Sequence, residues 1–293
     1  MTDAHKMELK SFRTLWGAGG DHAAIAAAAR AAGFDGLEGG LPEDPRGVRV
    51  LASALAAHGL GYIGEICTGG SSGAYWIPAR HAGVEDHLRS VEDGLRRLRD
   101  SGLEPLFVNC MGGLDAWPIA ASVDFFGRAM ELGAAYGVTL SFETHRARSM
   151  FSPWATQAIV EALPDILVTC DFSHWCVVAE RLIDDEREAL ATVCPRVFHI
   201  QCRVGYEQGP QVPHPAAPEY RYALEAHQRW WEMVWAAQRA RGQRISTITP
   251  EFGPDGYLQA APFGGEPVAD LWEINRWMAD TERAHFAAWL ARG

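Results

Sequence analysis

The chain has 293 residues, of which 48% are hydrophobic and 22% are charged. This composition is typical of a globular protein with a large core, and it excludes a collagen, a coiled coil and a largely disordered chain. The 37 acidic residues outnumber the 26 basic ones, which gives a net charge of −11. Such a charge disfavours nucleic acid and anionic membrane surfaces as partners, and we expect neither.

In chain order, short apolar segments that predict strands alternate with longer segments that have helical periodicity. The expected pairs are strand 12–16 with helix 21–32, strand 34–41 with helix 45–58, strand 61–67 with helix 84–101, strand 105–110 with helix 118–136, strand 139–144 with helix 153–163, strand 166–172 with helix 184–193, strand 197–202 with helix 219–241, and strand 245–252 with helix 267–290.

Eight strand–helix pairs without a break in composition predict an α/β fold, a (β/α)8 TIM barrel that forms a single domain over residues 1–293. The strands are apolar throughout, as expected where both faces of a sheet are buried. An open doubly wound sheet is the alternative, because the sequence does not reveal the order of the strands. The proline-rich segment 205–218 follows a strand, so we expect it to be an insertion on the catalytic rim.

The sequence also carries signals about the compartment. No run of about 18 apolar residues predicts a transmembrane helix, and residues 1–6 have no apolar core typical of a signal peptide. The six cysteines form neither a C-x-x-C pair nor a dense, evenly spaced frame, which predicts reduced thiols. We therefore expect a cytoplasmic protein. The sequence leaves its oligomeric state open, a homo-oligomer included.

One glycine-rich turn imitates a dinucleotide-binding motif. Residues 17–22 read Gly-Ala-Gly-Gly-Asp-His between a strand and a helix, and Glu38 follows about twenty residues later, where a ribose ligand would be. However, His22 replaces the third glycine, and its side chain would prevent the helix from packing closely. We favour a turn in which Asp21 caps the helix, and keep an NAD-binding oxidoreductase as a distant alternative.

Polar residues end the last four predicted strands. They are Glu143 in the fifth strand, Asp171 in the sixth, His199 and Gln201 in the seventh, and Glu251 in the eighth. In a barrel these strand ends converge, and burying three carboxylates together is very costly unless a cation or protons neutralise them. The set therefore predicts one divalent metal ion. Its mostly oxygen ligands suit Mn²⁺ first, with Mg²⁺, Co²⁺ or Zn²⁺ as alternatives.

Each of these residues also has a purely structural interpretation. Asp171 could cap the turn that follows it, and His199 could be a hydrogen-bonded core histidine. Glu38 and Glu65 end strands as well, but each stands alone there, and we interpret them as structural or supporting residues. The coincidence of polar groups on four successive strands is what favours a site. Four tryptophans that follow strands could form a platform for a sugar or simply pack: Trp16, Trp76, Trp117 and Trp175.

The segment from Glu143 to Pro254 resembles the xylose isomerase-like barrel family of sugar and sugar-phosphate isomerases and epimerases. This family includes ketose 3-epimerases, hydroxypyruvate isomerases and inosose dehydratases. The first half of the chain matches it only as an eight-unit layout. The resemblance implies a metal held by the following residues of this chain: Glu143, Asp171, Gln201 or His199, and Glu251.

The resemblance also implies substrate-binding residues. The family's Asp-x-x-His pattern recurs here as Asp171-Phe172-Ser173-His174, and an arginine after the ligand of the seventh strand usually holds the substrate. His174 and Arg203 are the matching residues. His145 is a weaker candidate for the same role, because it lies two residues past Glu143 on the same face of the strand.

The choice of ligand in the seventh strand stays open. His199 and Gln201 are two residues apart and point to the same face. The His-Ile-Gln sequence resembles the hydroxypyruvate isomerase branch, in which the glutamine is the ligand, whereas alignment on His-Ile alone favours the histidine, as in ketose epimerases. We favour Gln201, because it lies nearer the carboxyl end of the strand.

The ligand set predicts the chemistry of a metal-dependent sugar isomerase or epimerase. The metal would stabilise an enediolate formed when a proton leaves the carbon beside a carbonyl. Glu143 and Glu251 are the predicted catalytic residues, one removing the proton and the other returning it. If the β-carbon carries a leaving group, the same intermediate expels it, and a dehydratase or lyase acting on a keto-sugar or keto-glycoside is the alternative. The expected partner is a small unphosphorylated sugar or keto-sugar.

Overall fold

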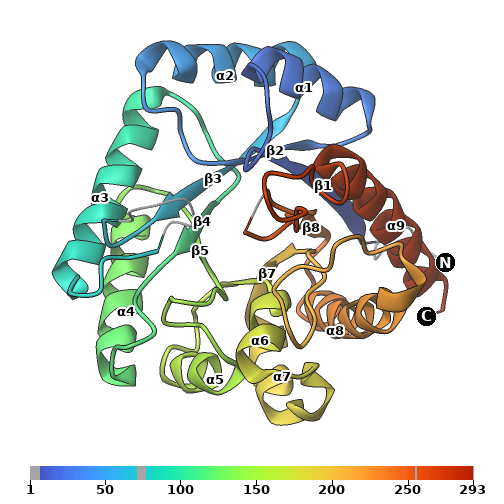
Figure 1. Cartoon of the computed structure of the whole chain (residues 1–293). Coiled ribbons are helices and arrows are strands. Elements are labelled where there is room, and N and C mark those ends of the chain that lie inside the picture. The colour runs from blue at the N-terminus through green and yellow to red at the C-terminus, as the bar shows by residue number, and fades with distance from the viewer. Residues whose placement is uncertain (1–6, 71–76, 255, 293) are drawn as a thin grey trace, which may run out of the picture.

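The computed structural model describes residues 7–70, 77–254 and 256–292. Eight parallel strands form a closed barrel in chain order, and β8 pairs with β1 to complete the ring. The helices surround this ring on the outside, and α9 lies beside β1 (Figure 1). The predicted (β/α)8 TIM barrel is therefore confirmed, and closure of the ring excludes the open sheet.

The strands are short and the helices vary widely in length. The strands are β1 (Glu8–Thr14), β2 (Gly36–Gly39), β3 (Gly61–Cys67), β4 (Val108–Met111), β5 (Leu140–Glu143), β6 (Val168–Cys170), β7 (Val197–Gln201) and β8 (Ile245–Thr249). The helices are α1 (His22–Ala31), α2 (Pro45–His58), α3 (Val84–Ser101), α4 (Ile119–Ala135), α5 (Pro153–Ala162), α6 (Phe172–Ala179), α7 (Arg187–Val193), α8 (Arg221–Ala240) and α9 (Leu271–Ala291). Within the described residues, no helix combines the length and the apolar character needed to cross a membrane.

Two features of the helices differ from the sequence prediction. Helix α6 was not expected, and the predicted strand 166–172 ends at Cys170 instead. The reason is that the Asp171 side chain accepts a hydrogen bond from the Ser173 backbone N–H at 3.0 Å, which caps the start of α6. Helix α9 begins at Leu271 rather than near residue 267, because Asp270 caps it by accepting from Glu273 N at 2.8 Å.

The inside of the barrel changes from apolar to polar along its axis. Phe12, Ile63 and Phe107 form a buried cluster against Phe198 near the amino ends of the strands, and the rings of Phe107 and Phe198 meet edge to face at 5.0 Å. Further along the strands, alternate residues that point inward are polar. This plug fills the inside of the barrel near the amino ends of the strands.

The proline-rich segment 205–218 lies between β7 and α8 and contacts the loop after β8. The Gln211 side chain accepts from Gly253 N at 2.8 Å and donates to Gly253 O at 3.2 Å. Val212 N also donates to Val204 O at 2.9 Å, which folds the segment back towards the end of β7. These bonds join the two loops that follow the last two strands.

A substitution at Gly36 in β2 would test how tightly the aromatic plug is packed. A Cβ atom at this position would lie 2.4 Å from the Phe12 ring and 2.4 Å from the Gly61 carbonyl oxygen. We expect Gly36→Ala to lower the free energy of unfolding by about 1–3 kcal/mol, measured by urea denaturation, because overpacking strains the core. Gly19→Ala is the control, since nothing lies within 4 Å of its added Cβ. Equal effects of the two substitutions would contradict this account of the plug.

Candidate metal centre

A cavity of about 590 Å³ opens at the carboxyl ends of the strands. Much of its wall is apolar, with Trp16 and Tyr257 in edge-to-face contact at 4.8 Å between ring centroids. Its inner charged or titratable groups include Glu65, Glu143, Glu251, His145 and Arg203, while Glu43, Asp93 and Arg97 also line it. Most of the residues predicted for the site therefore lie in or directly beside this one cavity.

Three carboxylates converge beside the cavity. Glu143 ends β5, Asp171 follows β6 and Glu251 lies two residues beyond β8. Each offers an oxygen atom, and these atoms lie within 4.8 Å of one another. Their residues are only 1%, 0% and 6% exposed, so water can solvate the charges only poorly. The barrel has thus brought together the carboxylates that the sequence placed on separate strand ends.

Arg203 supplies positive charge to this cluster. Its Nη2 atom donates to Asp171 Oδ2, and its Nη1 atom donates to the Glu251 carbonyl oxygen at 3.1 Å and lies 3.6 Å from Glu251 Oε2. Burial lowers the pKa of the guanidinium, but Asp171 and Glu251 outweigh burial and raise it. One guanidinium cannot balance three ionised carboxylates, since three negative charges and one positive charge leave a net charge of −2.

Burial and mutual repulsion hold protons on this cluster. Burial raises the pKa of Glu143 well above its usual range, and the charges of Asp171 and Glu65 raise it further. Burial and the charge of Glu143 do the same to the pKa of Glu251. A divalent cation is the kind of ligand that would replace these protons and let the carboxylates ionise.

Two buried oxygen atoms fit such a cation. Glu143 Oε1 and Gln201 Oε1 have no hydrogen-bond partner within the described residues, although both are shielded from solvent. A buried acceptor without a partner is costly, and a bound ion would satisfy it. The donor set of three carboxylates and one amide oxygen consists of hard ligands, which suits Mg²⁺, Mn²⁺ or a similar ion.

The two candidates in β7 have different surroundings. His199 uses both ring nitrogens, because Nδ1 lies 2.8 Å from Thr247 Oγ1 and Nε2 lies 3.1 Å from Glu38 Oε2. Gln201 donates its Nε2 to Glu38 Oε1 at 2.9 Å and leaves its Oε1 open. This geometry leaves Gln201 an atom with which to bind a metal ion and leaves His199 none.

Glu38 joins these groups into a network that the sequence did not reveal. Its carboxylate also lies 3.4 Å from Asn109 Nδ2, and that amide nitrogen donates to Glu143 Oε2 at 2.6 Å. Glu38 therefore lies inside the barrel, 1% exposed, and not on the surface where a ribose would bind. Asp21, the other part of the dinucleotide-like motif, caps α1 by accepting from Ala24 N at 2.8 Å, as predicted.

Asn109 was not singled out from the sequence. The only signal for it is its position in β4, two residues after Phe107, on the face that points into the barrel.

His174 lies in α6, fully buried behind Arg203 and outside the cavity wall. Its Nε2 atom is 2.7 Å from Arg203 Nη2, and since a guanidinium can only donate, Nε2 must accept. The ring is therefore neutral and carries its proton on Nδ1. Burial lowers the pKa of His174 well below its usual range, and His145 and Arg203 lower it further. Direct contact of His174 with a sugar stays a prediction.

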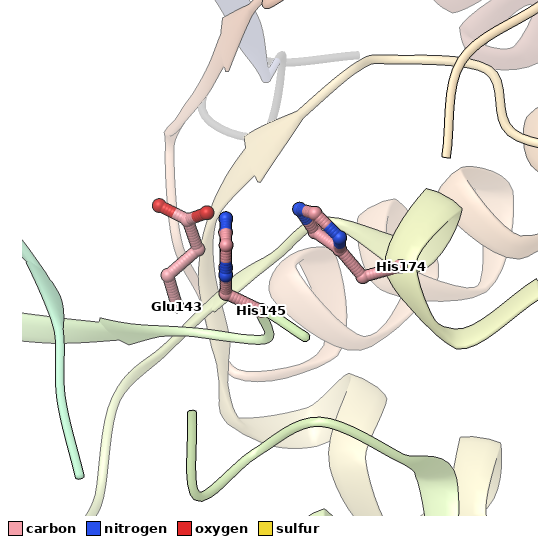
Figure 2. Close-up of side chains that lie close together, drawn as sticks. All are labelled: Glu143, His145 and His174. Carbon is pink, nitrogen blue, oxygen red and sulfur yellow. The ribbon is translucent and has the colours of Figure 1, made fainter. Parts of the chain in front are cut away.

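His145 faces the cavity and stacks on His174, with ring centroids 4.0 Å apart. Figure 2 shows the two rings beside Glu143, and these three residues also offer ligand atoms within 4.8 Å of one another. His145 Nδ1 lies 2.5 Å from the Arg146 carbonyl oxygen, so it carries the proton and leaves the Nε2 lone pair free to accept. Burial lowers the pKa of His145, which keeps the ring neutral.

The tryptophans predicted as a platform have different positions. Trp16 is part of the cavity wall. Trp175 is fully buried in the hydrophobic core, and Trp117 is partly buried and packs against that core. Trp76 lies outside the described residues.

Comparison with known proteins agrees with the barrel fold. The chain belongs to the xylose isomerase-like TIM barrel family, whose sequence model matches residues 26–214. No curated protein sequence matches the chain significantly.

Solved structures share the fold at low sequence identity. The apo 3-keto-D-glucoside 4-epimerase YcjR from E. coli is 14% identical, with a TM-score of 0.58 over 95% of this chain and 100% of the other. A xylose isomerase-like TIM barrel protein from Mycobacterium smegmatis in complex with magnesium is 12% identical, with a TM-score of 0.58 over 97% and 99%. The IOLI protein with a bound zinc atom is 13% identical, with a TM-score of 0.58 over 98% and 99%.

The geometry of β7 predicts which of its side chains matters for metal binding. We expect Gln201→Leu to weaken Mn²⁺ or Mg²⁺ binding by at least about 10–100-fold in isothermal titration calorimetry, because it removes a ligand oxygen. His199→Asn should have a smaller effect on affinity, since His199 supports Glu38 rather than offering a free atom. The opposite order of effects would identify His199 as the ligand.

Proposed function

We propose that this protein is a divalent-metal-dependent sugar isomerase or epimerase that acts on a small unphosphorylated keto-sugar. The observation that carries the proposal is the convergence of Glu143, Asp171 and Glu251 within 4.8 Å, together with the unpaired buried oxygens of Glu143 and Gln201. These groups lie against a cavity large enough for a sugar. Family membership and the enzymes among the structural neighbours support the same class of activity.

In this proposal Glu143, Asp171, Gln201 and Glu251 hold the ion. The ion would supply positive charge beside the carbonyl oxygen of the substrate, where negative charge develops as the neighbouring C–H bond breaks. Mn²⁺ is our first choice, and Mg²⁺, Co²⁺ and Zn²⁺ are the alternatives.

Glu143 and Glu251 carry the proton transfer. They come from β5 and β8, three strands apart in the ring, so they can approach opposite faces of one carbon. One of them, as a carboxylate, removes the proton next to the carbonyl. The other, in its acid form, returns a proton to the enediolate. Asn109 donates to Glu143 Oε2 and thereby fixes the direction of the other oxygen.

The remaining groups of the cavity orient the sugar. Arg203 places a fixed positive charge at the cavity wall, and His145 Nε2 offers an acceptor to a sugar hydroxyl. Trp16 and Tyr257 present apolar surface to the face of the ring. The excess of carboxylates around the cavity disfavours a phosphate group, which supports an unphosphorylated substrate.

A second candidate is a lyase that eliminates a group from the β-carbon of a keto-glycoside. The cavity volume of about 590 Å³ favours this possibility. It falls within the range of about 300–1,000 Å³ found for pockets that hold drug-sized ligands, so it leaves room for a substituent on the sugar.

Removal of the metal provides the first test of the proposal. Dialysis against EDTA should abolish turnover of the active compound in a panel of ketohexoses and 3-keto-glucosides, followed by NMR. Adding Mn²⁺ or Mg²⁺ should restore turnover, because the carboxylates would again be ionised and the carbonyl polarised. Undiminished activity after complete removal of metal would refute metal dependence.

The roles of the two glutamates provide the second test. Glu143→Gln and Glu251→Gln should each lower kcat by about 10²–10⁴-fold, the usual contribution of general acid–base catalysis. In D₂O the wild-type protein should incorporate deuterium at the carbon beside the ketone. Glu104→Gln is the matched control, because this exposed glutamate precedes β4 at the opposite end of the barrel. Full activity in both site variants would exclude the proton-transfer mechanism.

A further inference from the structure

A second cavity lies beside the substrate cavity, and the proposed function does not use it. Its volume is about 400 Å³, within the range of about 300–1,000 Å³ found for small-molecule pockets. Trp16 and Gly17 line both cavities and form a wall between them. The other walls come from the end of β1, the loops after β1 and β8, and the start of α9. A ligand here would lie next to the substrate without taking its place.

The glycine-rich turn that imitates a dinucleotide-binding motif lines this second cavity. Gly17, Ala18 and Gly19 contribute to the wall. A Cβ atom at Gly17 would lie 2.9 Å from Pro254 Cδ, and the φ angle of +71° at Gly17 also favours glycine. Nothing lies within 4 Å of a Cβ atom added at Gly19. The turn therefore leaves open space at this wall instead of filling it with side chains.

Arg13 is the only cation among the described residues that line the second cavity. Its Nη1 atom donates to the Ile25 carbonyl oxygen at 2.9 Å, and its guanidinium lies over the Trp272 ring, 4.0 Å from the ring centroid. Within the described part of the chain, no carboxylate lies at ion-pair distance from Arg13, and its other nitrogens have no acceptor. The ring and the carbonyl group thus fix the guanidinium, while its remaining donors stay open to a ligand.

Arg241 shows how the chain satisfies another arginine whose pKa burial lowers. Each of its guanidinium nitrogens has an acceptor: Nε donates to Gln243 Oε1 at 3.1 Å, Nη1 to the Pro195 carbonyl oxygen at 2.8 Å, and Nη2 to the Val197 carbonyl oxygen. Burial lowers the pKa of Arg13 as well, and no carboxylate offsets this effect. An anion in the second cavity would supply the acceptors and the charge that Arg13 lacks.

The other charged group of the cavity limits the class of ligand. Asp270 also lines it, and its Oδ1 atom accepts from Glu273 N at 2.8 Å to cap α9. This carboxylate repels an anionic group placed close to it, but it can accept a hydrogen bond from a hydroxyl group. A ligand with an anionic group at one end and hydroxyl groups at the other would therefore suit both Arg13 and Asp270.

We propose that the second cavity binds a small hydroxylated anion, a sugar acid or a sugar phosphate, whose anionic group pairs with Arg13. The planar guanidinium presents fixed donors, which match the oxygens of a carboxylate or a phosphate. The hydroxyl groups of the ligand would face Asp270 and the backbone of the glycine-rich turn. The site goes beyond the proposed function, because neither Arg13 nor Asp270 holds the metal ion or transfers a proton.

The test measures binding of gluconate and of glucose 6-phosphate to the whole protein by isothermal titration calorimetry. We expect at least one of these anions to bind, and the tighter one identifies the anionic group. Arg13→Gln should weaken this binding about 10–100-fold, because it removes charge-assisted hydrogen bonds. Arg30→Gln is the matched control: it removes the same charge from an exposed arginine in the last turn of α1 and should leave the affinity unchanged.

Two further measurements separate this site from the metal centre and from a folding defect. The affinity should stay the same after metal is removed by EDTA and dialysis, because the proposed metal ligands line the other cavity or lie beside it. Circular dichroism and the unfolding temperature report whether Arg13→Gln is folded. Arg13→Lys keeps the charge but loses the planar fork, so its affinity should lie below that of the wild type even if Arg13→Gln does not fold.

The outcomes distinguish this inference from the proposed function. Binding of neither anion, or wild-type affinity in a folded Arg13→Gln or in Arg13→Lys, would overturn the site. Binding that disappears with the metal would place the anion in the substrate cavity and would also overturn it. None of these results affects metal-dependent proton exchange on a keto-sugar. Conversely, a protein that lacks this exchange but binds the anion through Arg13 would refute the proposed function and support the second site.

Discussion

The site depends on one constraint: negative charges buried together must be neutralised. Glu143, Asp171 and Glu251 converge with their side chains almost completely buried, and Arg203 contacts two of the three. The remaining charge requires either protons or a cation, and burial and neighbouring negative charge raise the pKa of Glu143 and of Glu251. A protein gains nothing in stability from such an arrangement, so the cluster is better explained by ion binding than by folding.

Beneath this cluster, Glu38 determines the direction of the groups above it. It receives hydrogen bonds from His199 and Gln201, and Asn109 lies between Glu38 and Glu143. Since the Gln201 amide nitrogen is engaged with Glu38, its oxygen must point to the other side. The aromatic plug packs against this layer, since the ring centroids of Phe107 and His199 are 5.2 Å apart. Order in the candidate ligands therefore comes from a buried layer that need not contact the substrate.

Sequence reasoning predicted the barrel well because its elements are local. Strand β3 and helices α2 and α3 were predicted to the residue, and Glu143, Asp171 and Glu251 could be placed because strand ends in a barrel must converge. It failed where the outcome depends on distant partners. Glu38 and His199 are 161 residues apart in sequence, so nothing local indicates that they meet. Helix α6 was missed because its apolar residues look like a continuing strand, and only the bond from Ser173 N to Asp171 distinguishes the two.

The two halves of the ring divide the chemistry of the cavity. Burial raises the pKa of Glu143 at the end of β5, of Glu251 after β8 and of Glu65 in β3. A cation bound between β5 and β8 would lower the pKa of Glu143 and Glu251, the carboxyl groups it touches, more than that of Glu65 on β3. The ion would therefore act first on the carboxylates of the last four strands. Side chains of the first four strands, Glu38 and Asn109, hold the neighbouring groups in place, because Asn109 lies between Glu38 and Glu143.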